Sequence, residues 1–307
     1  MKCLQLYGSR QSPSLELSER PIPEPTTGEI LVRVRAAGLM PSELEWYPTW
    51  HTREGPERRQ AIPSHEFAGE VAALGPSVTG FSAGDAVFGM NDWFEEGAMA
   101  EYCLSRPEWL APSPRNLSAA EAASVPISAL TAWQALFDRG RLSAGETVLI
   151  HGGAGAVGST AIQLARNSQA RVIATASAHN SSFVRELGAY KVIDYKAQPF
   201  ETQAEPVDLV LDTIGGDTLE RSWSVLKPNG RLVTVATASE SATDERTREA
   251  FLLVQIRDDQ LRHLSELVEK GALRPLVSRS ILLTEAADAY LGRIRGNGRG
   301  KVVVTLD

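Results

Sequence analysis

Cysteine is scarce in this chain of 307 residues, which contains only Cys3 and Cys103. Two thiols cannot form the disulfide framework of a small secreted protein, nor supply the four cysteines of a structural zinc site. The first ten residues also lack the basic and then apolar plan of a secretory signal. These absences favour a reducing compartment, and we expect the protein in the cytoplasm.

Long apolar runs are absent as well. No stretch approaches the roughly 20 apolar residues of a membrane-spanning helix, so we expect no membrane partner. The net charge is −7, with Lys and Arg scattered along the chain, which argues against a nucleic-acid partner. The chain exceeds what one hydrophobic core usually supports, so two domains are expected.

The sequence texture changes near residue 115. Before it, short alternating or apolar segments separated by Pro and Gly predict a compact β-rich domain, most clearly at residues 29–38, 65–75 and 84–90. Ser118 and Glu121 then form an S-x-x-E capping box, which predicts a helix that Pro126 interrupts. Strand and helix patterns alternate beyond this point, which predicts a doubly wound parallel sheet.

The last third of the chain contains four further predicted elements. We expect a last apolar strand at residues 250–254, helices at 258–270 and 284–294, and a strand at 301–306. The final strand should return to the first domain, because a short strand after a helix needs an existing sheet. The predicted domains are therefore 1–117, 118–257, and a segment 258–307 that rejoins the first.

The most informative segment is ETVLIHGGAGAVGSTAIQLAR, residues 146–166, in which a short apolar strand turns through glycines into an amphipathic helix. The G-x-G-x-x-G spacing allows a tight turn, close approach of a pyrophosphate, and close packing of helix on strand. The helix N-terminus supplies free N–H groups for the anion. A plain turn between strand and helix is the alternative. The predicted cofactor-binding residues are Gly153, Ala154, Gly155, Ala156, Val157 and Gly158.

An acidic residue is missing after the next predicted strand, residues 171–175. A carboxylate there would hold the ribose 2′-OH of NAD, but the following residues, ASAHN, contain none. Nothing therefore repels a 2′-phosphate, and we predict NADP(H) as the cofactor. Ser177 is a candidate donor to that phosphate, with Tyr195 nearby. The alternatives are that Ser177 caps a helix and that Tyr195 packs at a strand end.

Several motifs occur in a characteristic order: PSHEFAGEVAALG, FSAGDAVFG, ISALTAWQAL, the glycine segment, LGAYKVIDY, VDLVLDTIGG, LKPNGRLVTV and GRGKVVV. In this order the chain resembles the medium-chain dehydrogenase/reductase superfamily, and more closely its zinc-independent, NADPH-dependent quinone and enone oxidoreductase branch. The resemblance implies an α/β fold, with a GroES-like β-rich catalytic domain and an inserted Rossmann domain. It also implies a homodimer, formed by pairing the last Rossmann strands, here residues 250–254.

Metal ligands are too few for the zinc sites of related alcohol dehydrogenases. Leu39 and Met40 stand where a first zinc cysteine of the resembling proteins would be. His65 and Glu66 form the His-Glu pair of the motif, but one histidine without thiolates is more typical of a hydrogen-bonded structural residue. We therefore expect no metal. A zinc-type alcohol dehydrogenase, or an NADPH-binding protein with little turnover that acts through a partner, are the alternatives.

A quinone or an α,β-unsaturated carbonyl compound is already polarised toward hydride and needs no metal ion to activate it. The predicted reaction is therefore hydride transfer from NADPH to such an acceptor. The carbonyl oxygen gains negative charge and must meet a donor. Tyr47 is the candidate, because its hydroxyl can donate and its ring can stack on a flat substrate. The alternative is that Tyr47 and its aromatic neighbours only pack in a loop and that the proton comes from water. The predicted pocket residues are Met40, Trp46, Trp50 and Trp93.

Further site residues follow from the resemblance. Thr131 matches the threonine expected beside the nicotinamide, although a hydroxyl bonded to its own helix is the alternative. Thr213, and Ala236 with Thr237, follow strands whose carboxyl ends bind ligands in open α/β sheets. Arg299 is a candidate for contact with phosphate or substrate, or else a solvated loop charge.

Overall fold

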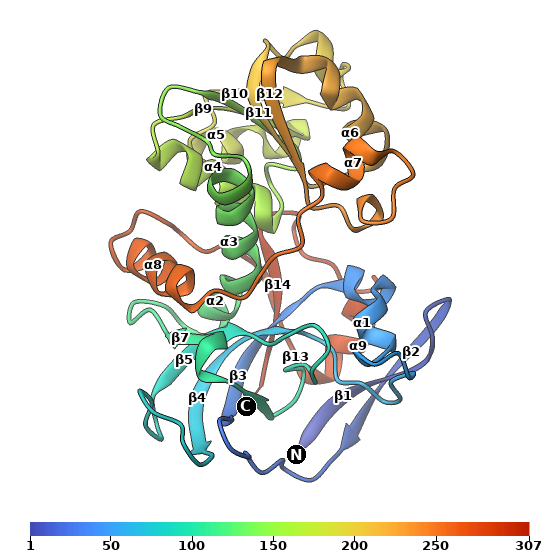
Figure 1. The fold of residues 1–307 in the computed structure, drawn as a ribbon, viewed down its shortest axis with the longest axis vertical. Helices are drawn as coiled ribbons and strands as arrows, with labels where there is room; N and C mark the ends of the chain where they lie inside the picture. Colours follow the sequence, from blue (N-terminus) through green and yellow to red (C-terminus); the bar gives the residue numbers. More distant parts are fainter. Residues whose placement is uncertain (307) are drawn as a thin grey trace. The chain divides into compact units, whose positions relative to one another are not determined.

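The computed structural model describes residues 1–306, except for the side chain of Thr237. The chain forms two compact units, of which unit 1 comprises Met1–Ile127, Ile256–Lys270 and the stretch from Pro275 onward. Unit 2 comprises Ser128–Gln255 and Gly271–Arg274. Residue 117, the predicted boundary, lies inside unit 1. The fold class is α/β with a β-rich unit and a doubly wound unit, which confirms the prediction (Figure 1).

Unit 1 is built on a seven-stranded sheet with the order β13-β14-β3-β4-β5-β7, in which β6 also pairs with β3. Its pairs are antiparallel except β13 with β14. The strands are β3 Ile30–Leu39, β4 Glu66–Leu74, β5 Ala86–Met90, β6 Tyr102–Ser105, β7 Leu110–Pro112, β13 Val277–Leu282 and β14 Lys301–Thr305. Strands β1 Lys2–Ser9 and β2 Ser12–Glu19 form a separate hairpin.

Strand β14 pairs with β3, its Val304 opposite Ala37, so the predicted return of the last strand to the first β-rich region is confirmed. The apolar side chains of β3, β4 and β14 share one core, and Phe67 and Val304 are fully buried in it. Burial of such side chains contributes about 1.5–3 kcal/mol each and holds these distant segments in one sheet.

The helical segments of unit 1 are short apart from α8. They are η1 Pro41–Glu45, α1 Tyr47–Trp50, η2 Pro107–Trp109, α2 Ala119–Ala123, α8 Asp258–Glu269, η8 Leu283–Glu285 and α9 Ala286–Tyr290. The predicted capping box is present, since Ser118 and Glu121 each accept a hydrogen bond from the other's N–H. Helix α9 ends before residue 294, because Gly292 has a φ of +73° and stops the helix.

Unit 2 contains a parallel sheet with the order β10-β9-β8-β11-β12. The strand order reverses between β8 and β11, the place where open α/β sheets bind ligands. The strands are β8 Thr147–Ile150, β9 Arg171–Ala176, β10 Lys191–Asp194, β11 Val207–Asp212 and β12 Leu226–Thr234. This arrangement confirms the predicted doubly wound sheet.

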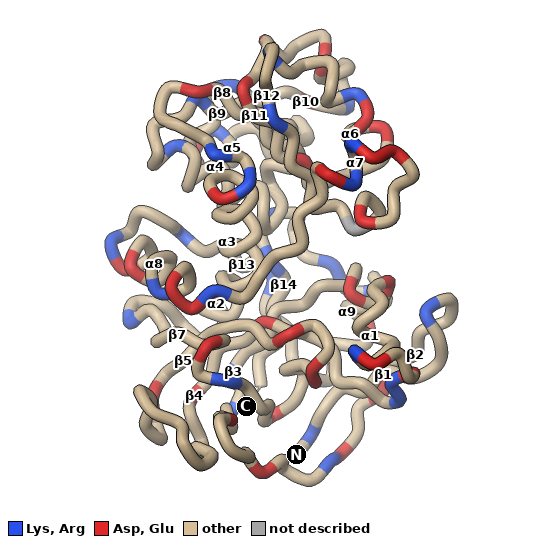
Figure 2. Tube along the Cα trace, viewed as in Figure 1, with Lys and Arg blue, Asp and Glu red and all other residues tan. Residues whose placement is uncertain are grey.

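Helices α4 and α5 lie on one side of this sheet, and α6 and α7 on the other (Figure 1). The helical segments are α3 Pro126–Trp133, η3 Gln134–Arg139, α4 Ala156–Asn167, η4 Ala178–Asn180, α5 Ser181–Leu187, η5 Phe200–Thr202, α6 Gly216–Ser222, η6 Trp223–Val225, η7 Thr237–Ser239 and α7 Glu245–Ala250. Acidic and basic residues are interspersed along both units (Figure 2).

The predicted strand at residues 250–254 is wrong. Asp244 accepts a hydrogen bond from the Thr247 N–H and caps α7, which takes up Ala250. Phe251 then makes a single parallel bridge with Thr234, and residues 252–257 have no regular structure. The segment therefore pairs with β12 at one residue only and forms no strand.

Within the part of the chain that the structure describes, no helix is both long and apolar enough to cross a membrane.

Candidate active site

The glycine segment forms a tight turn between β8 and α4. Gly152 has a φ of +70°, and its carbonyl accepts the Gly155 N–H at 2.9 Å. Gly152 stands one residue before the first glycine of the G-x-G-x-x-G spacing, which therefore missed it. A Cβ on Gly158 would lie 2.2 Å from the Gly152 carbonyl oxygen, so only glycine allows α4 to pack this close.

Gly155 is exposed and caps α4 without a side chain. A Cβ there would meet only the Gly152 carbonyl oxygen, at 3.3 Å. The N–H groups of Ala156, Val157 and Gly158 have no acceptor within the helix, because they belong to its first turn. An exposed backbone and the positive end of a helix together form a cradle that can accept an anion such as a pyrophosphate.

His151 fixes the start of this cradle, and the sequence analysis did not select it. Its ring is buried, with Nδ1 3.2 Å from Thr175 Oγ1 and Nε2 3.0 Å from Ser222 Oγ. Burial lowers the pKa of His151 to about 4, so the imidazole is neutral at neutral pH. The Gly153 N–H donates to the Thr175 carbonyl at 2.9 Å. The His151 side chain and the glycine turn are thus both held by Thr175 at the end of β9.

The carboxyl ends of β11 and β12 carry the next two predicted residues. Thr213 Oγ1 donates to the His151 carbonyl at 2.9 Å and lies against Gly152. Ala236 follows β12, and its N–H donates to Thr234 Oγ1 at 3.2 Å. The side chain of Thr237 lies outside the described part of the structure.

Asp212 ties these two strands together and was missed because it ends an apolar run. It is fully buried and accepts the Thr234 hydroxyl at 2.7 Å. It also accepts the N–H groups of Ile214 at 3.1 Å and of Gly215 at 3.0 Å. Asp212 therefore fixes the edge of the sheet from which Thr213 and Ala236 extend.

The end of β9 carries Ser177, which is half-buried. Ser177 occupies the N-cap position of η4, but its side chain makes no capping hydrogen bond. Asp194 of β10 is paired with Ala176, which places Tyr195 beside Ser177 in the register. The Tyr195 side chain is 54% exposed, so it is not packed at the strand end.

Thr131 is buried in α3. Over the described residues, no hydrogen bond joins its hydroxyl to the backbone of its own helix, so that alternative is not observed. Arg299 lies in unit 1, whereas Thr131 and the glycine segment lie in unit 2. The Arg299 N–H donates to Asn297 Oδ1 at 2.9 Å.

The predicted pocket residues separate into two environments of unit 1. Trp46 and Trp93 meet edge to face, with ring centroids 4.8 Å apart, and Met40 is half-buried at the start of η1. Trp50 is packed into the core, where its Nε1 donates to the Leu44 carbonyl at 2.7 Å.

Tyr47 stacks on His51, with ring centroids 4.1 Å apart and an interplanar angle of 4°. Its side chain is 51% exposed. A half-exposed phenol that is held by stacking can reach a ligand without a change of fold.

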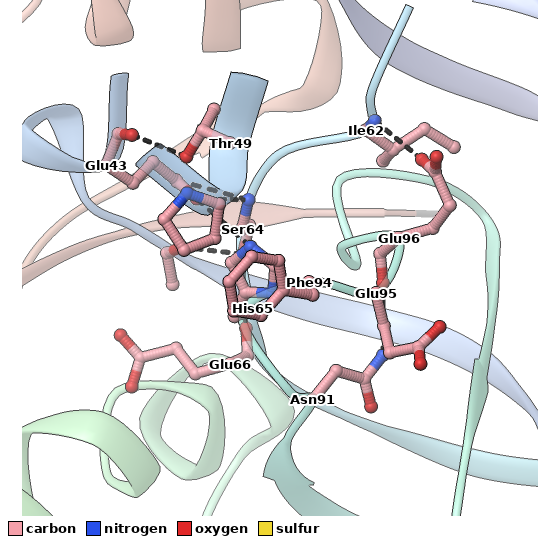
Figure 3. Close-up of polar contacts among 12 residues, drawn as sticks. Glu43, Thr49, Ile62, Ser64, His65, Glu66, Asn91, Phe94, Glu95 and Glu96 are labelled. Carbon is pink, nitrogen blue, oxygen red and sulfur yellow. Dashed lines mark hydrogen bonds and ion pairs between the residues drawn. The ribbon is translucent and has the colours of Figure 1, made fainter. Parts of the chain in front are cut away.

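His65 and Glu66 point in different directions (Figure 3). The His65 ring meets Trp93 edge-on, with centroids 5.2 Å apart, and burial lowers its pKa to about 3. Glu66 is buried, forms an ion pair with Lys301, and accepts the Ile127 N–H at 2.9 Å.

Over the described residues, no three side chains of His, Cys, Asp or Glu come together as metal ligands. Burial also raises the pKa of the Cys103 thiol, which disfavours the thiolate that zinc requires. The residues present therefore do not fit a zinc ion.

Comparison with known proteins agrees with this architecture. An alcohol dehydrogenase GroES-like domain matches residues 26–115, and a zinc-binding dehydrogenase domain matches residues 187–304. The chain is 32% identical to a chloroplastic quinone-oxidoreductase of Triphysaria versicolor, over 93% of this chain and 92% of the relative. It is 30% identical to a 2-methylene-furan-3-one reductase of Solanum lycopersicum, over 97% of this chain and 76% of the relative.

A solved quinone oxidoreductase from Coxiella burnetii is similar in structure, with a TM-score of 0.90 and 33% identity, over 100% of this chain and 99% of that one. The two units and the glycine cradle define a nicotinamide-dependent oxidoreductase. The chain belongs to the medium-chain dehydrogenase/reductase superfamily, in its quinone oxidoreductase branch. Membership implies an NAD(P)H cofactor and a small-molecule substrate.

Proposed function

We propose that this protein is a zinc-independent oxidoreductase that transfers a hydride from NADPH to a quinone or an α,β-unsaturated carbonyl compound. The observation that carries the proposal is the exposed Gly155 cradle in a chain similar to quinone oxidoreductases over nearly its whole length. The 2-methylene-furan-3-one reductase among its relatives supports the inclusion of enones.

NADP(H) is the proposed cofactor, and it supplies the hydride when bound. The backbone of residues 153–158 binds its pyrophosphate. Ser177 and Tyr195 bind the 2′-phosphate, because the end of β9 offers a free hydroxyl and no carboxylate. The remaining proposed cofactor contacts are Thr131, Thr213, Ala236, Thr237 and Arg299.

The acceptor is proposed to bind against Trp46 and Trp93, with Met40 beside them. Flat conjugated molecules suit aromatic side chains that meet edge to face. Tyr47 donates its hydroxyl hydrogen to the carbonyl oxygen as charge develops there. Trp50, predicted to line the pocket, supports it from the core. A cytoplasmic homodimer with a cofactor domain at residues 118–257 completes the proposal, without the strand pairing at residues 250–254 as its interface.

An NADPH-oxidation screen tests this function. NADPH binding is first measured by fluorescence, and then quinones, 2-alkenals and cyclic enones are added with zinc chelated. Oxidation by at least one of these classes supports the proposal. Binding without oxidation by any class would favour a nucleotide-binding protein that acts through a partner. Stoichiometric zinc in the active purified protein would favour an alcohol dehydrogenase.

A further inference from the structure

Glu43 lies where three segments of unit 1 meet. Its buried carboxylate accepts the Ser64 N–H at 3.1 and 3.0 Å, and also the Tyr290 hydroxyl. Ser64 precedes β4, whereas Tyr290 ends α9, 247 residues after Glu43. Ser64 has a φ of +69°, a strained conformation for a residue other than glycine, which this contact helps to hold.

The backbone of Glu43 holds the aromatic loop that follows it. Its carbonyl accepts Thr49 Oγ1 at 2.6 Å and the Trp46 N–H at 3.0 Å. Figure 3 shows the contacts of Glu43 with both Thr49 and Ser64. The segment that carries Trp46 and Tyr47 is therefore fixed at the same residue as the segment that carries Ser64.

The same carboxylate faces the ring of His65, whose Nε2 lies 3.8 Å from Glu43 Oε2. His65 contacts Trp93, and Trp93 contacts Trp46. We call His65, Trp93 and Trp46 the aromatic wall. Glu43 is connected to both ends of this wall: its carboxylate accepts the N–H of Ser64, the residue before His65, and its backbone carbonyl accepts the Trp46 N–H.

We propose that Glu43 is a positioning residue whose ionised carboxylate holds the aromatic wall in place for the acceptor, and that protonation of Glu43 loosens the wall. The inference rests on the proposed function, in which Trp46 and Trp93 bind the acceptor.

The charge environment gives Glu43 a titration near neutral pH. The pKa of Glu43 is raised to about 7, chiefly by burial; the Tyr290 hydroxyl, the Ser64 N–H and the charge of Lys301 oppose this rise, and the charge of Glu66 adds to it. His65 also faces it but stays neutral, because burial lowers the pKa of that imidazole to about 3. Tyr290 remains a phenol, since its pKa is raised well above the ordinary value.

Ionisation strengthens the contacts but costs stability. Hydrogen bonds from the Ser64 N–H and the Tyr290 hydroxyl to a carboxylate are stronger than those to a neutral acid. Because the pKa is raised in the folded state, the folded protein binds more protons than the unfolded chain between about pH 4.5 and 7. Stability from this group is therefore present below that range and lost as the pH rises through it.

Steady-state kinetics between about pH 6 and 8 test the proposal. Glu43→Gln mimics the neutral acid and cannot ionise, and Glu45→Gln changes an exposed residue of the same η1 segment as a matched control. In the wild type, the acceptor KM should fall about fivefold as the pH rises, with a midpoint near 7. Glu43→Gln should keep the high KM throughout, with the NADPH KM unchanged, and Glu45→Gln should follow the wild type.

Two further measurements separate positioning from a merely structural role. Glu43→Gln should raise the urea midpoint of unfolding at about pH 8, because it removes a buried charge, whereas loss of a structural contact alone would lower it. Tyr290→Phe should move the kinetic midpoint to higher pH, because the hydroxyl that lowers the pKa of Glu43 is gone. If Glu43→Gln does not fold, the kinetic midpoint of Tyr290→Phe tests the proposal instead.

The proposal is contradicted by a flat wild-type KM, by a step that persists in Glu43→Gln, or by an unchanged midpoint in Tyr290→Phe. Near-UV circular dichroism reports the packing of the aromatic side chains, Trp46 and Trp93 among them, without any turnover. If no acceptor oxidises NADPH, the proposed function fails. A near-UV transition near pH 7 that is absent in Glu43→Gln would then still support the role of Glu43, and an identical spectrum at every pH would overturn it.

Discussion

The glycine cradle of unit 2 and the Glu43 cluster of unit 1 are built in opposite ways. The cradle comes from one continuous segment, residues 150–158, in which backbone groups are the proposed contacts. The cluster joins Glu43 to Tyr290, 247 residues away, and consists of buried polar side chains. Short-range geometry can be inferred from spacing, whereas long-range polar contacts emerge only once the sheet has formed.

The largest expected effect on stability comes from the buried ion pair of Glu66 with Lys301 in unit 1. Glu66→Gln leaves Lys301 buried without its carboxylate, which should lower the free energy of unfolding by about 3–5 kcal/mol. Urea denaturation measures this change. The double variant Glu66→Gln/Lys301→Met removes both charges and should recover a large part of the loss. No recovery would mean that the lysine charge is not what destabilises the single variant.

The cradle offers a matched pair of glycine substitutions. Gly158→Ala places a Cβ 2.2 Å from the Gly152 carbonyl oxygen, so the free energy of unfolding should fall by about 2 kcal/mol. Gly155→Ala should change it by about 1 kcal/mol or less, because its Cβ would meet only the Gly152 carbonyl oxygen, at 3.3 Å. Its Cβ instead obstructs the approach of the pyrophosphate, so the NADPH Kd should rise at least about tenfold. Equal effects of the two variants on both quantities would refute these separate roles.

The preference for NADPH over NADH should correspond to a smaller free-energy difference than the losses of stability expected for Glu66→Gln and Gly158→Ala. With no carboxylate after β9, the KM for NADPH should be at least about tenfold below that for NADH, or about 1.4 kcal/mol. Ser177→Asp introduces the missing negative charge and should make the KM for NADH the lower of the two. Ser177→Ala should only raise the KM for NADPH. Comparable constants for the two cofactors in the wild type would contradict the assignment.

The smallest expected effect concerns Tyr47. Tyr47→Phe should lower kcat with enones more than with quinones, by about tenfold at most, because the enolate formed from an enone must be protonated, whereas quinone reduction needs no dedicated acid. Parallel assays with a cyclic enone and a quinone measure the ratio. An unchanged ratio would exclude Tyr47 from proton delivery.

Local signals were the most predictable part of this fold. The β8 strand, α4 and the Ser118 capping box follow from spacing within a few residues, and all three are present. The return of β14 was predictable because a lone strand must find a sheet. The strand at residues 250–254 failed, because an aspartate cap extended α7 over its first residue.

The candidate site was less predictable than the fold, because residue type alone does not show where a side chain points. Trp50 was grouped with Trp46 by proximity in sequence, yet one side of the short α1 helix packs into the core. Gly152 was overlooked because the motif spacing begins one residue later. The role of Glu43 depends on α9, which no spacing near residue 43 could reveal.

Isotope transfer tests the central claim most directly. NADPH carrying two deuterons at nicotinamide C4 is incubated with zinc-depleted protein and a cyclic enone, and the product is analysed by mass spectrometry and NMR. The account predicts one deuteron on the β-carbon of the saturated ketone. An unlabelled product, or turnover that appears only when zinc is restored, would contradict it.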